Sequence, residues 1–307
     1  MEPSFDTALV TGGRGFLGRG IVAALRGAGW RVATIGAARR GDAADHVAVA
    51  GPSDAEGIAA ALVALRPALV VHLAAAAPGA PPEDHEAVTV AGTRALLAAL
   101  SGQRAPPVLL AFGSAAEFGP IDAGAGPLPE SWPCAPSSPH GRAKHAASLA
   151  VQRYLAESGA PGAVLRLFTA AGPGAPAAML LGRIAAEIAA MPPAGGAVRV
   201  AGPERERDYL PVTEVARLVM RLAPRARELP ALLHLCSGRG IAVREWIAAL
   251  AAARGVPVTV LPRQDGARRD DPARVVGDPG LLRALGLAPA AFDLATLARE
   301  IMAPWRG

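Results

Sequence analysis

Aromatic side chains and cysteines are scarce in this sequence of 307 residues. Phenylalanine, tryptophan and tyrosine together make up 4% of the chain, whereas hydrophobic residues of all kinds make up 51%. The core must therefore consist mainly of alanine, valine and leucine, whose small side chains let helices pack closely against a sheet. The two cysteines, Cys134 and Cys236, form no CxxC pair, which excludes a disulfide framework and favours a reducing, cytoplasmic compartment.

Long apolar runs and a concentrated basic face are also missing. No stretch has the length and purity of a membrane span, and the acidic beginning MEPSFDTALV is unlike a signal peptide. The net charge is +5, but the densest basic cluster, RRDDPAR, is interrupted by acids. His46, His85 and His145 show no paired spacing of the kind that metal ligands have. We therefore expect no membrane, no nucleic acid and no metal as partners, which leaves small molecules, including anionic ones.

Short apolar runs alternate with helix-like segments in the first half of the chain. The expected strands span residues 7–13, 31–36, 47–51, 68–76, 107–114 and 162–169. The expected helices span residues 16–29, 54–67, 83–102 and 140–159. Because the strands are apolar on both faces, they predict a parallel sheet with helices on both sides and ligands at its carboxyl edge. The predicted fold class is α/β, a Rossmann-type doubly wound parallel sheet.

Glycines follow the first expected strand at a regular spacing. In TGGRGFLG, residues 11–18, Gly12, Gly15 and Gly18 form a GxxGxxG pattern between a strand and a helix. The first glycine permits a tight turn, the second lets the backbone approach a pyrophosphate, and the third allows close contact between helix and strand. The helix N-terminus then faces the negative charge. This context favours a dinucleotide site over the alternative, a glycine-rich turn without a ligand.

The alternation of strands and helices becomes weaker after residue 172. Helices are expected near residues 176–191, 212–223, 243–254 and 291–302, and short strands near 198–201, 232–236 and 257–261. We therefore predict a dinucleotide-binding Rossmann domain over residues 1–172. Residues 173–307 form a smaller, mainly substrate-binding region, in which segments around 205–237 return to the Rossmann sheet.

Eight segments of the chain have a distinctive motif character. The glycine pattern with ALVTGG ahead of it is the first. The others are HLAA (72–75), VAGTRALL (90–97), GSAAEFG (113–119), HGRAK (140–144), LRLFTAAGPG (165–174), RDYLPVTEVARLV (207–219) and RRDDP (268–272). Together they resemble motifs of the short-chain dehydrogenase/reductase superfamily, in particular of its extended branch, the nucleotide-sugar epimerases, dehydratases and reductases. The resemblance covers nearly the whole chain. It implies a nicotinamide cofactor, a nucleotide-linked small-molecule substrate, and a homodimer formed through the helices at 83–102 and 140–159.

The resemblance also implies that Ser114, His140 and Lys144 are the catalytic residues. Ser114 matches the hydroxyl that binds the reacting oxygen, and Lys144 matches the lysine that contacts the nicotinamide ribose. His140 stands where the family has a tyrosine, one helical turn from Lys144 and on the same face. Imidazole is a competent general acid or base, although a nearby cation favours its neutral form. Another proton source, or a site without redox turnover, remains an alternative, since Thr89 and Thr169 replace two family asparagines as well.

The second expected strand ends without the carboxylate that would bind a ribose 2′-hydroxyl and favour NAD, because Gly36 stands there. Arg14 lies in the glycine loop, Arg39 and Arg40 follow Gly36, and guanidinium groups suit a 2′-phosphate. NADP(H) is therefore favoured over NAD(H), against the alternative that Arg39 and Arg40 form a solvated turn. The predicted cofactor contacts are Gly12, Arg14, Gly15, Phe16, Leu17, Gly18, Arg39, Arg40, Ala74 and Lys144.

Two arginines and a glutamate are the predicted substrate contacts. By resemblance, Arg207 and Arg268 bind a substrate pyrophosphate through their forked guanidinium groups, and Glu117 faces the sugar. The alternative for each arginine is an ion pair with one of the acids Glu206, Asp208, Asp270 and Asp271.

The predicted function is that of an NAD(P)-dependent oxidoreductase or epimerase, which acts on a nucleotide-linked keto sugar or a related polar carbonyl compound in specialised biosynthesis. Two alternatives remain. One is non-redox acid–base chemistry, such as elimination or cyclisation, on the same scaffold. The other is a catalytically inert NADP(H)-binding protein.

Overall fold

The chain forms two compact units, and neither is contiguous in sequence. The computed structural model describes residues 6–38, 43–122, 124–263 and 271–303. Unit 1 comprises residues 1–117, 138–167 and 215–233, and unit 2 comprises residues 118–137, 168–214 and 234–307. The predicted division at residue 172 is therefore too simple. Of the segment predicted to return to the main sheet, 205–237, residues 215–233 belong to unit 1 and the rest belongs to unit 2.

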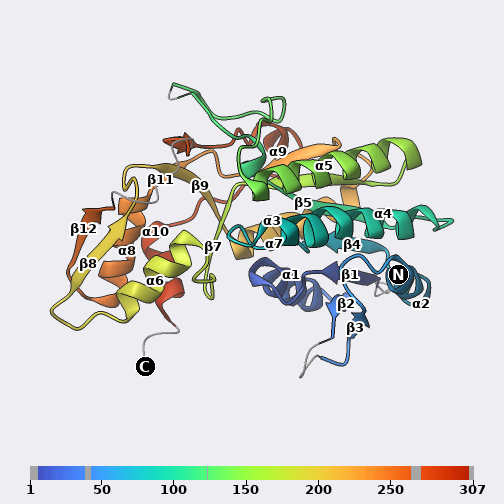
Figure 1. Cartoon of the computed structure of the whole chain (residues 1–307), viewed down its shortest axis with the longest axis horizontal. Coiled ribbons are helices and arrows are strands. Elements are labelled where there is room, and N and C mark those ends of the chain that lie inside the picture. Colours follow the sequence, from blue (N-terminus) through green and yellow to red (C-terminus); the bar gives the residue numbers. More distant parts are fainter. Residues whose placement is uncertain (1–5, 39–42, 123, 264–270, 304–307) are drawn as a thin grey trace. The chain divides into compact units, whose positions relative to one another are not determined.

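Unit 1 is built on a seven-stranded sheet. Its strands are β1 (Thr7–Thr11), β2 (Arg31–Ala37), β3 (His46–Val49), β4 (Leu69–His72), β5 (Val108–Ser114), β6 (Gly162–Leu167) and β10 (Leu232–Leu235), whose last two residues belong to unit 2. They follow the order β10-β6-β5-β4-β1-β2-β3, and every pairing from β6 to β3 is parallel (Figure 1). The strand order reverses between β1 and β4, which is the place where such sheets bind ligands. The predicted Rossmann-type doubly wound sheet is thereby confirmed.

Helices flank this sheet and supply its core. They are α1 (Phe16–Gly27), α2 (Ala55–Leu65), α3 (Pro82–Asp84), the π-helix η1 (His85–Ala91), α4 (Gly92–Ser101), the short 3-10 turns η2 (Ala115–Glu117) and η3 (Ala223–Arg225), α5 (Pro139–Ser158) and α7 (Val212–Leu222), which begins in unit 2. One core contains residues of α2, α4, α5 and the strands, among them Leu62, Leu100, Val151 and Val164. Figure 1 shows α4 and α5 side by side over the sheet. Helices thus hold the strand ends, and the residues on them, in fixed positions.

Two local features of these helices bear on the site. The single helix predicted over residues 83–102 is divided, because its chain widens into the π-helix η1 before α4 begins. Helix α5 begins where Ser138 accepts a hydrogen bond from the backbone nitrogen of Gly141 at 3.0 Å, and it ends at the left-handed Gly159. Each of these two segments carries a histidine near its beginning, His85 in η1 and His140 in α5.

Unit 2 is centred on strand β9 (Glu206–Pro211). Its other strands are β7 (Thr169–Ala171), β8 (Gly196–Val200), β11 (Gly240–Ala242), β12 (Val258–Pro262) and β13 (Arg274–Val275), and its helices are α6 (Leu180–Ala189), α8 (Val243–Arg254), α9 (Gly280–Ala284) and α10 (Leu294–Met302). Strand β9 pairs with β7, β11 and β13, and β8 pairs with β12. Trp246 is 1% exposed in the core of unit 2. Its ring packs edge-on against that of Tyr209, with 5.1 Å between the ring centroids.

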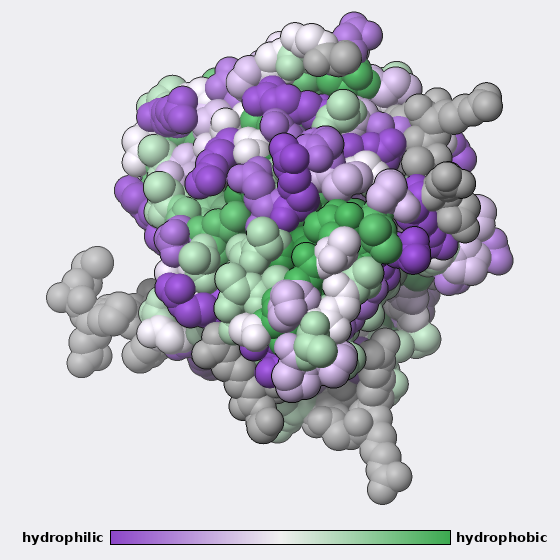
Figure 2. Space-filling view, turned by 90° about the vertical axis from the view of Figure 1, so that its left-hand side faces the viewer, coloured by the Kyte–Doolittle hydropathy of each residue, from purple (hydrophilic) through white to green (hydrophobic). Residues whose placement is uncertain are grey.

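The surface carries few large apolar side chains. The most exposed in the described part of the chain are Val63, Leu149, Leu180 and Leu281. On the face shown in Figure 2, hydrophobic residues are intermingled with hydrophilic ones. Among the described helices, none has both the length and the apolar character that crossing a membrane requires.

Candidate active site

The glycine loop turns sharply between β1 and α1. Gly12 adopts a left-handed φ of +68°, and a Cβ on it would lie 2.9 Å from the backbone nitrogen of Ala74. A Cβ on Gly18 would lie 2.6 Å from the Cα of Gly13 and would overlap the carbonyl oxygen of Gly12. Gly15 precedes α1, whose N-terminus has no side-chain cap and can therefore face an anion. The geometry thus shows the tight turn at Gly12 and the close packing at Gly18 that the glycine spacing predicts.

A cleft of about 420 Å³ lies beside this loop, at the switch point of the sheet. The loop, the ends of β1, β2 and β4, and residues of α2, η1 and α4 form its walls. The predicted cofactor contacts among the residues that line it are Gly12, Arg14, Gly15 and Ala74. Those outside its lining are Phe16, Leu17 and Gly18, which form the first turn of α1, and Lys144. Arg39 and Arg40 lie outside the described residues.

The far wall of the cleft, at the end of β2, is basic. Arg14 donates a hydrogen bond from Nη2 to the carbonyl oxygen of Ala37 at 2.7 Å, and this nitrogen lies 3.5 Å from where a Cβ on Gly36 would be. His46 lines the same wall, with Nδ1 2.8 Å from Thr34 Oγ1 and Nε2 3.2 Å from the carbonyl oxygen of Gly36. Sequence reasoning missed His46 as a site residue, because nothing in its local pattern shows which strand end it will reach.

A chain of hydrogen bonds ties β1 to β4 beneath the cleft. His72 is buried, with Nδ1 2.7 Å from Thr11 Oγ1 and Nε2 3.0 Å from Thr93 Oγ1. Because Thr93 donates its hydroxyl proton to the carbonyl oxygen of Thr89 at 2.6 Å, His72 must donate from Nε2 and accept at Nδ1. Burial lowers the pKa of His72 to about 3, which keeps the ring neutral. His72 is therefore the hydrogen-bonded core residue of strand β4. Thr11 also accepts from the backbone nitrogen of Ala74.

Lys144 lies inside unit 1 between these polar groups and strand β5. Its Nζ donates a hydrogen bond to the carbonyl oxygen of Phe112 at 2.8 Å. Burial lowers the pKa of Lys144 to about 8, and the nearby charge of Glu117 opposes that shift. A small cavity of about 10 Å³, the size of one water molecule, is lined by Lys144, His72 and Ala74 among others. The lysine thus lies close to the floor of the cofactor cleft.

Ser114 and His140 occupy the positions that the motifs predict. Ser114 is the last residue of β5, and its Oγ accepts a hydrogen bond from the backbone nitrogen of Ala116 at 3.2 Å. His140 lies in the first turn of α5, one helical turn before Lys144, and its ring is half-buried. Its ring centroid lies 5.4 Å from that of His85, a contact that sequence reasoning missed.

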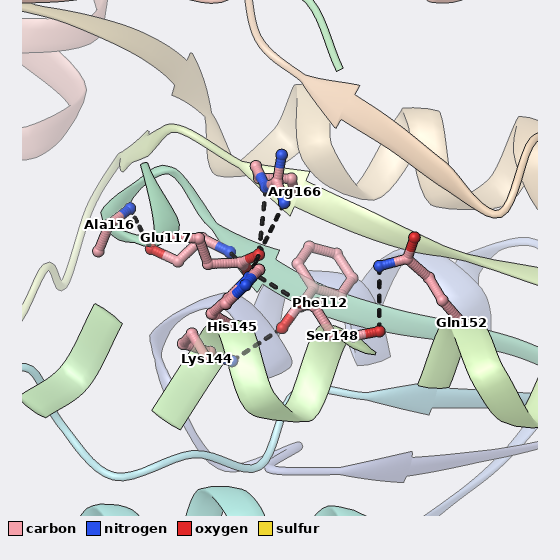
Figure 3. A network of polar contacts seen from close by, with 9 residues as sticks. Phe112, Ala116, Glu117, Lys144, His145, Ser148, Gln152 and Arg166 are labelled. Atoms are coloured by element: carbon pink, nitrogen blue, oxygen red, sulfur yellow. Dashed lines mark hydrogen bonds and ion pairs between the residues drawn. The ribbon is translucent and has the colours of Figure 1, made fainter. Parts of the chain in front are cut away.

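Glu117 does not face a substrate, and the prediction that it contacts the sugar is wrong for this structure. The residue is fully buried, and both carboxylate oxygens accept hydrogen bonds from protein groups (Figure 3). Oε1 accepts from the backbone nitrogen of Ser114 at 2.7 Å and from Ser148 Oγ at 2.9 Å. Oε2 accepts from Nη2 and Nε of Arg166, at 2.8 and 3.2 Å, and lies 3.8 Å from His145 Nδ1. Glu117 therefore fixes the end of strand β5 at Ser114 through a hydrogen bond to its backbone.

Arg207 forms an ion pair in unit 2. Its Nη2 lies 2.6 Å from Oδ1 of Asp271, and Nη1 of Arg205 lies 2.5 Å from Oδ2 of the same carboxylate. The ion-pair alternative for Arg207 is thus what the structure shows. Arg268 lies outside the described residues.

The glycine loop, the uncapped N-terminus of α1 and the cleft at the switch point define a dinucleotide-binding protein. The model of the NAD dependent epimerase/dehydratase family matches residues 8–232, and the chain belongs to this family. The resemblance predicted from the motifs is thereby confirmed, and with it the dependence of the enzyme on NAD(P).

Three individual proteins are similar to this chain over most of its length. A dTDP-6-deoxy-L-talose 4-dehydrogenase (NAD(P)(+)) from Kitasatospora kifunensis is 30% identical over 264 residues, which cover 84% of this chain and 82% of that protein. A UDP-glucose 4-epimerase from Thermus thermophilus in complex with NAD is 27% identical, with a TM-score of 0.82 and coverage of 98% and 99%. RMD from Pseudomonas aeruginosa, complexed with NADPH, is 25% identical, with a TM-score of 0.80 and coverage of 98% and 97%. Similar structures thus hold either cofactor.

Proposed function

We propose that this chain is an NADP(H)-linked oxidoreductase or epimerase that acts on a nucleotide-linked keto sugar. The observation that carries the proposal is the geometry of α5, which places His140 one turn before the buried Lys144, beside the strand that ends in Ser114. The relatives support the substrate class, because one is named a dTDP-sugar dehydrogenase and another a UDP-sugar epimerase.

Three side chains, those of Ser114, His140 and Lys144, have different roles in the proposed reaction. NADP(H), when bound, supplies the hydride or accepts it. The Ser114 hydroxyl binds the sugar oxygen and polarises it. His140 donates a proton to this oxygen in the reduction and removes that proton in the oxidation. Lys144 orients the nicotinamide ribose, while its cation, near His140, favours the neutral imidazole.

Preference for NADP(H) over NAD(H) is assigned to the basic wall of the cleft. Gly36 leaves the end of β2 without a carboxylate, and Arg14 extends its guanidinium across that position. A 2′-phosphate placed there would meet Arg14 and His46, and Arg39 and Arg40 follow in sequence. An adenosine 2′-hydroxyl alone would gain less from the guanidinium of Arg14.

Substrate binding is assigned to Arg207 and Arg268. A pyrophosphate that approached Arg207 would take the place of the Asp271 carboxylate, which occupies the guanidinium in the structure. Forked guanidinium groups bind phosphate oxygens with two parallel hydrogen bonds.

The decisive experiment mixes the protein with NADPH and a panel of dTDP- and UDP-linked 4-keto sugars. Both the absorbance of the reduced nicotinamide and the sugar products are followed, because an epimerase would consume no net NADPH. His140→Ala should lower turnover by about 10²–10⁴-fold, as expected for loss of a general acid–base. Calorimetry should show that NADPH binding is retained in the same variant.

Other outcomes identify the alternatives. Full turnover in His140→Ala would refute the role of His140 and indicate a different proton source. Product formed without any nicotinamide would favour non-redox chemistry. Binding of NADPH without product on any substrate, with activity gained in His140→Tyr, would indicate a protein that has lost turnover.

A further inference from the structure

His85 is a buried polar side chain that has no evident role in the fold. It is 2% exposed, and neither of its ring nitrogens has a hydrogen-bond partner among the described residues. His72, which is similarly buried, has both ring nitrogens bonded. A neutral imidazole carries one donor and one acceptor, and leaving them unsatisfied in the interior costs stability. An apolar side chain would avoid this cost, so the histidine calls for a functional explanation.

His85 lies against His140. The two ring centroids are 5.4 Å apart, and the ring planes meet at 62°, edge to face. His85 opens the π-helix η1, and His140 lies in the first turn of α5. π-Helical turns are rare and occur frequently at functional sites. The packing of η1 against α5 thus brings the second imidazole to the proposed acid–base group.

The distance between the rings allows a hydrogen bond when they rotate. Each nitrogen lies about 1.1 Å from its ring centre, so two nitrogens directed at each other would be roughly 3 Å apart, a normal hydrogen-bond length. The structure has no such bond at His85. Catalytic hydrogen bonds are often long or misaligned without substrate, and they tighten when the reacting group takes up charge.

We propose that His85 is a positioning residue that accepts a hydrogen bond from His140 while His140 is an imidazolium. The inference rests on the proposed role of His140. In the reduction, one N–H of His140 gives its proton to the sugar oxygen, and the other N–H donates to the unprotonated nitrogen of His85. His85 neither gains nor loses a proton, and His140 is recharged from water on its exposed side. A hydrogen bond to the charged form favours that form and so offsets the cation of Lys144.

Both exposed and buried charged groups lie on the elements around this pair. The exposed ones, which water screens, are Glu83 and Asp84 of α3, Glu86 of η1, Arg94 of α4 and Arg142 of α5. Glu86 and Arg94 also pair with each other at 3.7 Å. The remaining ones are the buried Lys144 and Glu117, the buried Arg166 of β6, which pairs with Glu117, and the half-buried His145 beside Glu117. Lys144 is the buried cation that lies one helical turn from His140 on the same helix.

The test is an NMR titration of the His140 ring in the full-length protein without substrate. In His85→Phe, we expect the titration midpoint of His140 to fall by about one pH unit, which is roughly tenfold less imidazolium at a fixed pH. His85→Gln should restore part of the shift, because its amide oxygen accepts a hydrogen bond. His234→Phe, which removes another buried histidine, should leave the His140 midpoint unchanged. The pH profile of keto-sugar reduction should move to lower pH in His85→Phe alone.

An unchanged His140 midpoint in His85→Phe would overturn the proposal. If His85→Phe does not fold, the ¹⁵N chemical shifts of the His85 ring in the unaltered protein test the proposal instead. When His140 becomes an imidazolium, one ring nitrogen of His85 should show the shift of a hydrogen-bonded nitrogen. If the accepting nitrogen of His85 keeps the shift of an unbonded nitrogen while His140 is protonated, the proposal is overturned as well. Failure of the proposed function reads differently: either the unaltered protein forms no product from the keto sugars, or His140→Ala keeps full turnover, whatever the titration shows.

Discussion

Replacing Glu117 by glutamine should destabilise unit 1 strongly. The carboxylate is fully buried opposite Arg166, which is 2% exposed, and it accepts two hydrogen bonds from that guanidinium. In Glu117→Gln, the guanidinium loses the charge that neutralises it. The new amide NH₂ group also has to face a donor, either Arg166 or the backbone nitrogen of Ser114. Both effects act in the folded state and leave the unfolded chain almost unchanged.

The expected cost is about 3–5 kcal/mol of unfolding free energy, the range found when one partner of a buried ion pair is removed. That is a large share of the roughly 5–15 kcal/mol that stabilises a typical domain. Urea unfolding followed by far-UV circular dichroism measures the difference. Arg166→Met in the same chain should recover part of the loss, because the buried charge is then gone as well.

An exposed ion pair in the same protein provides the matched control. Arg183 and Glu187 lie one turn apart on α6, and Nη1 of Arg183 is 3.2 Å from Oε2 of Glu187. Both side chains are more than a third exposed. Glu187→Gln should cost less than about 1 kcal/mol. Equal losses in Glu117→Gln and Glu187→Gln would show that burial of the Glu117 pair contributes nothing, and the reasoning would then be wrong.

Three further predictions concern the glycine loop, Lys144 and the cofactor wall. Gly18→Ala should abolish NADPH binding and lower stability because its Cβ overlaps Gly12, whereas Gly27→Ala on the same helix, where a Cβ meets nothing within 4 Å, should be neutral or stabilising by up to about 1 kcal/mol. Thermal melts and calorimetry separate the two variants. The pKa of Lys144 is about 8 when folded, against 10.5 for a free lysine, so the unfolded chain binds more protons between these pH values. The unfolding free energy of the wild type should therefore rise by about 3 kcal/mol relative to Lys144→Met as pH increases from 8 to 10.5, and parallel pH curves would contradict the assignment. Arg14→Ala should weaken NADPH binding about tenfold, with little effect on NADH, and equal losses for the two cofactors would count against a 2′-phosphate contact.

The local features of the site could be read from the sequence because they depend on chain periodicity. The GxxGxxG spacing places Gly12 and Gly15 in the turn between a strand and a helix, and Gly18 in the first turn of that helix. The four-residue spacing of His140 and Lys144 places both on one face of α5. Apolar runs on both faces of each strand predicted a covered parallel sheet, and the strand order confirms it.

The long-range pairings were decided by the tertiary structure. Glu117 was predicted to face the sugar, but Arg166 of the neighbouring strand β6 and Ser148 of α5 draw its carboxylate inward. Nothing in the local sequence of Glu117 indicates this, because the partner depends on which strand becomes the neighbour of β5. The contact between His85 and His140 is of the same kind, since it needs η1 to pack against α5.

The sequence by itself therefore determined the fold class, the glycine loop and the lysine–histidine spacing, which follow from backbone geometry over a few residues. It also determined the family, which its motifs identify by resemblance. The three-dimensional arrangement alone decided which buried charges neutralise each other, which histidines meet, and how the chain divides into two units. The physical reason is that burial and electrostatic pairing depend on neighbours that are distant in sequence and are brought together only when the sheet and its helices assemble.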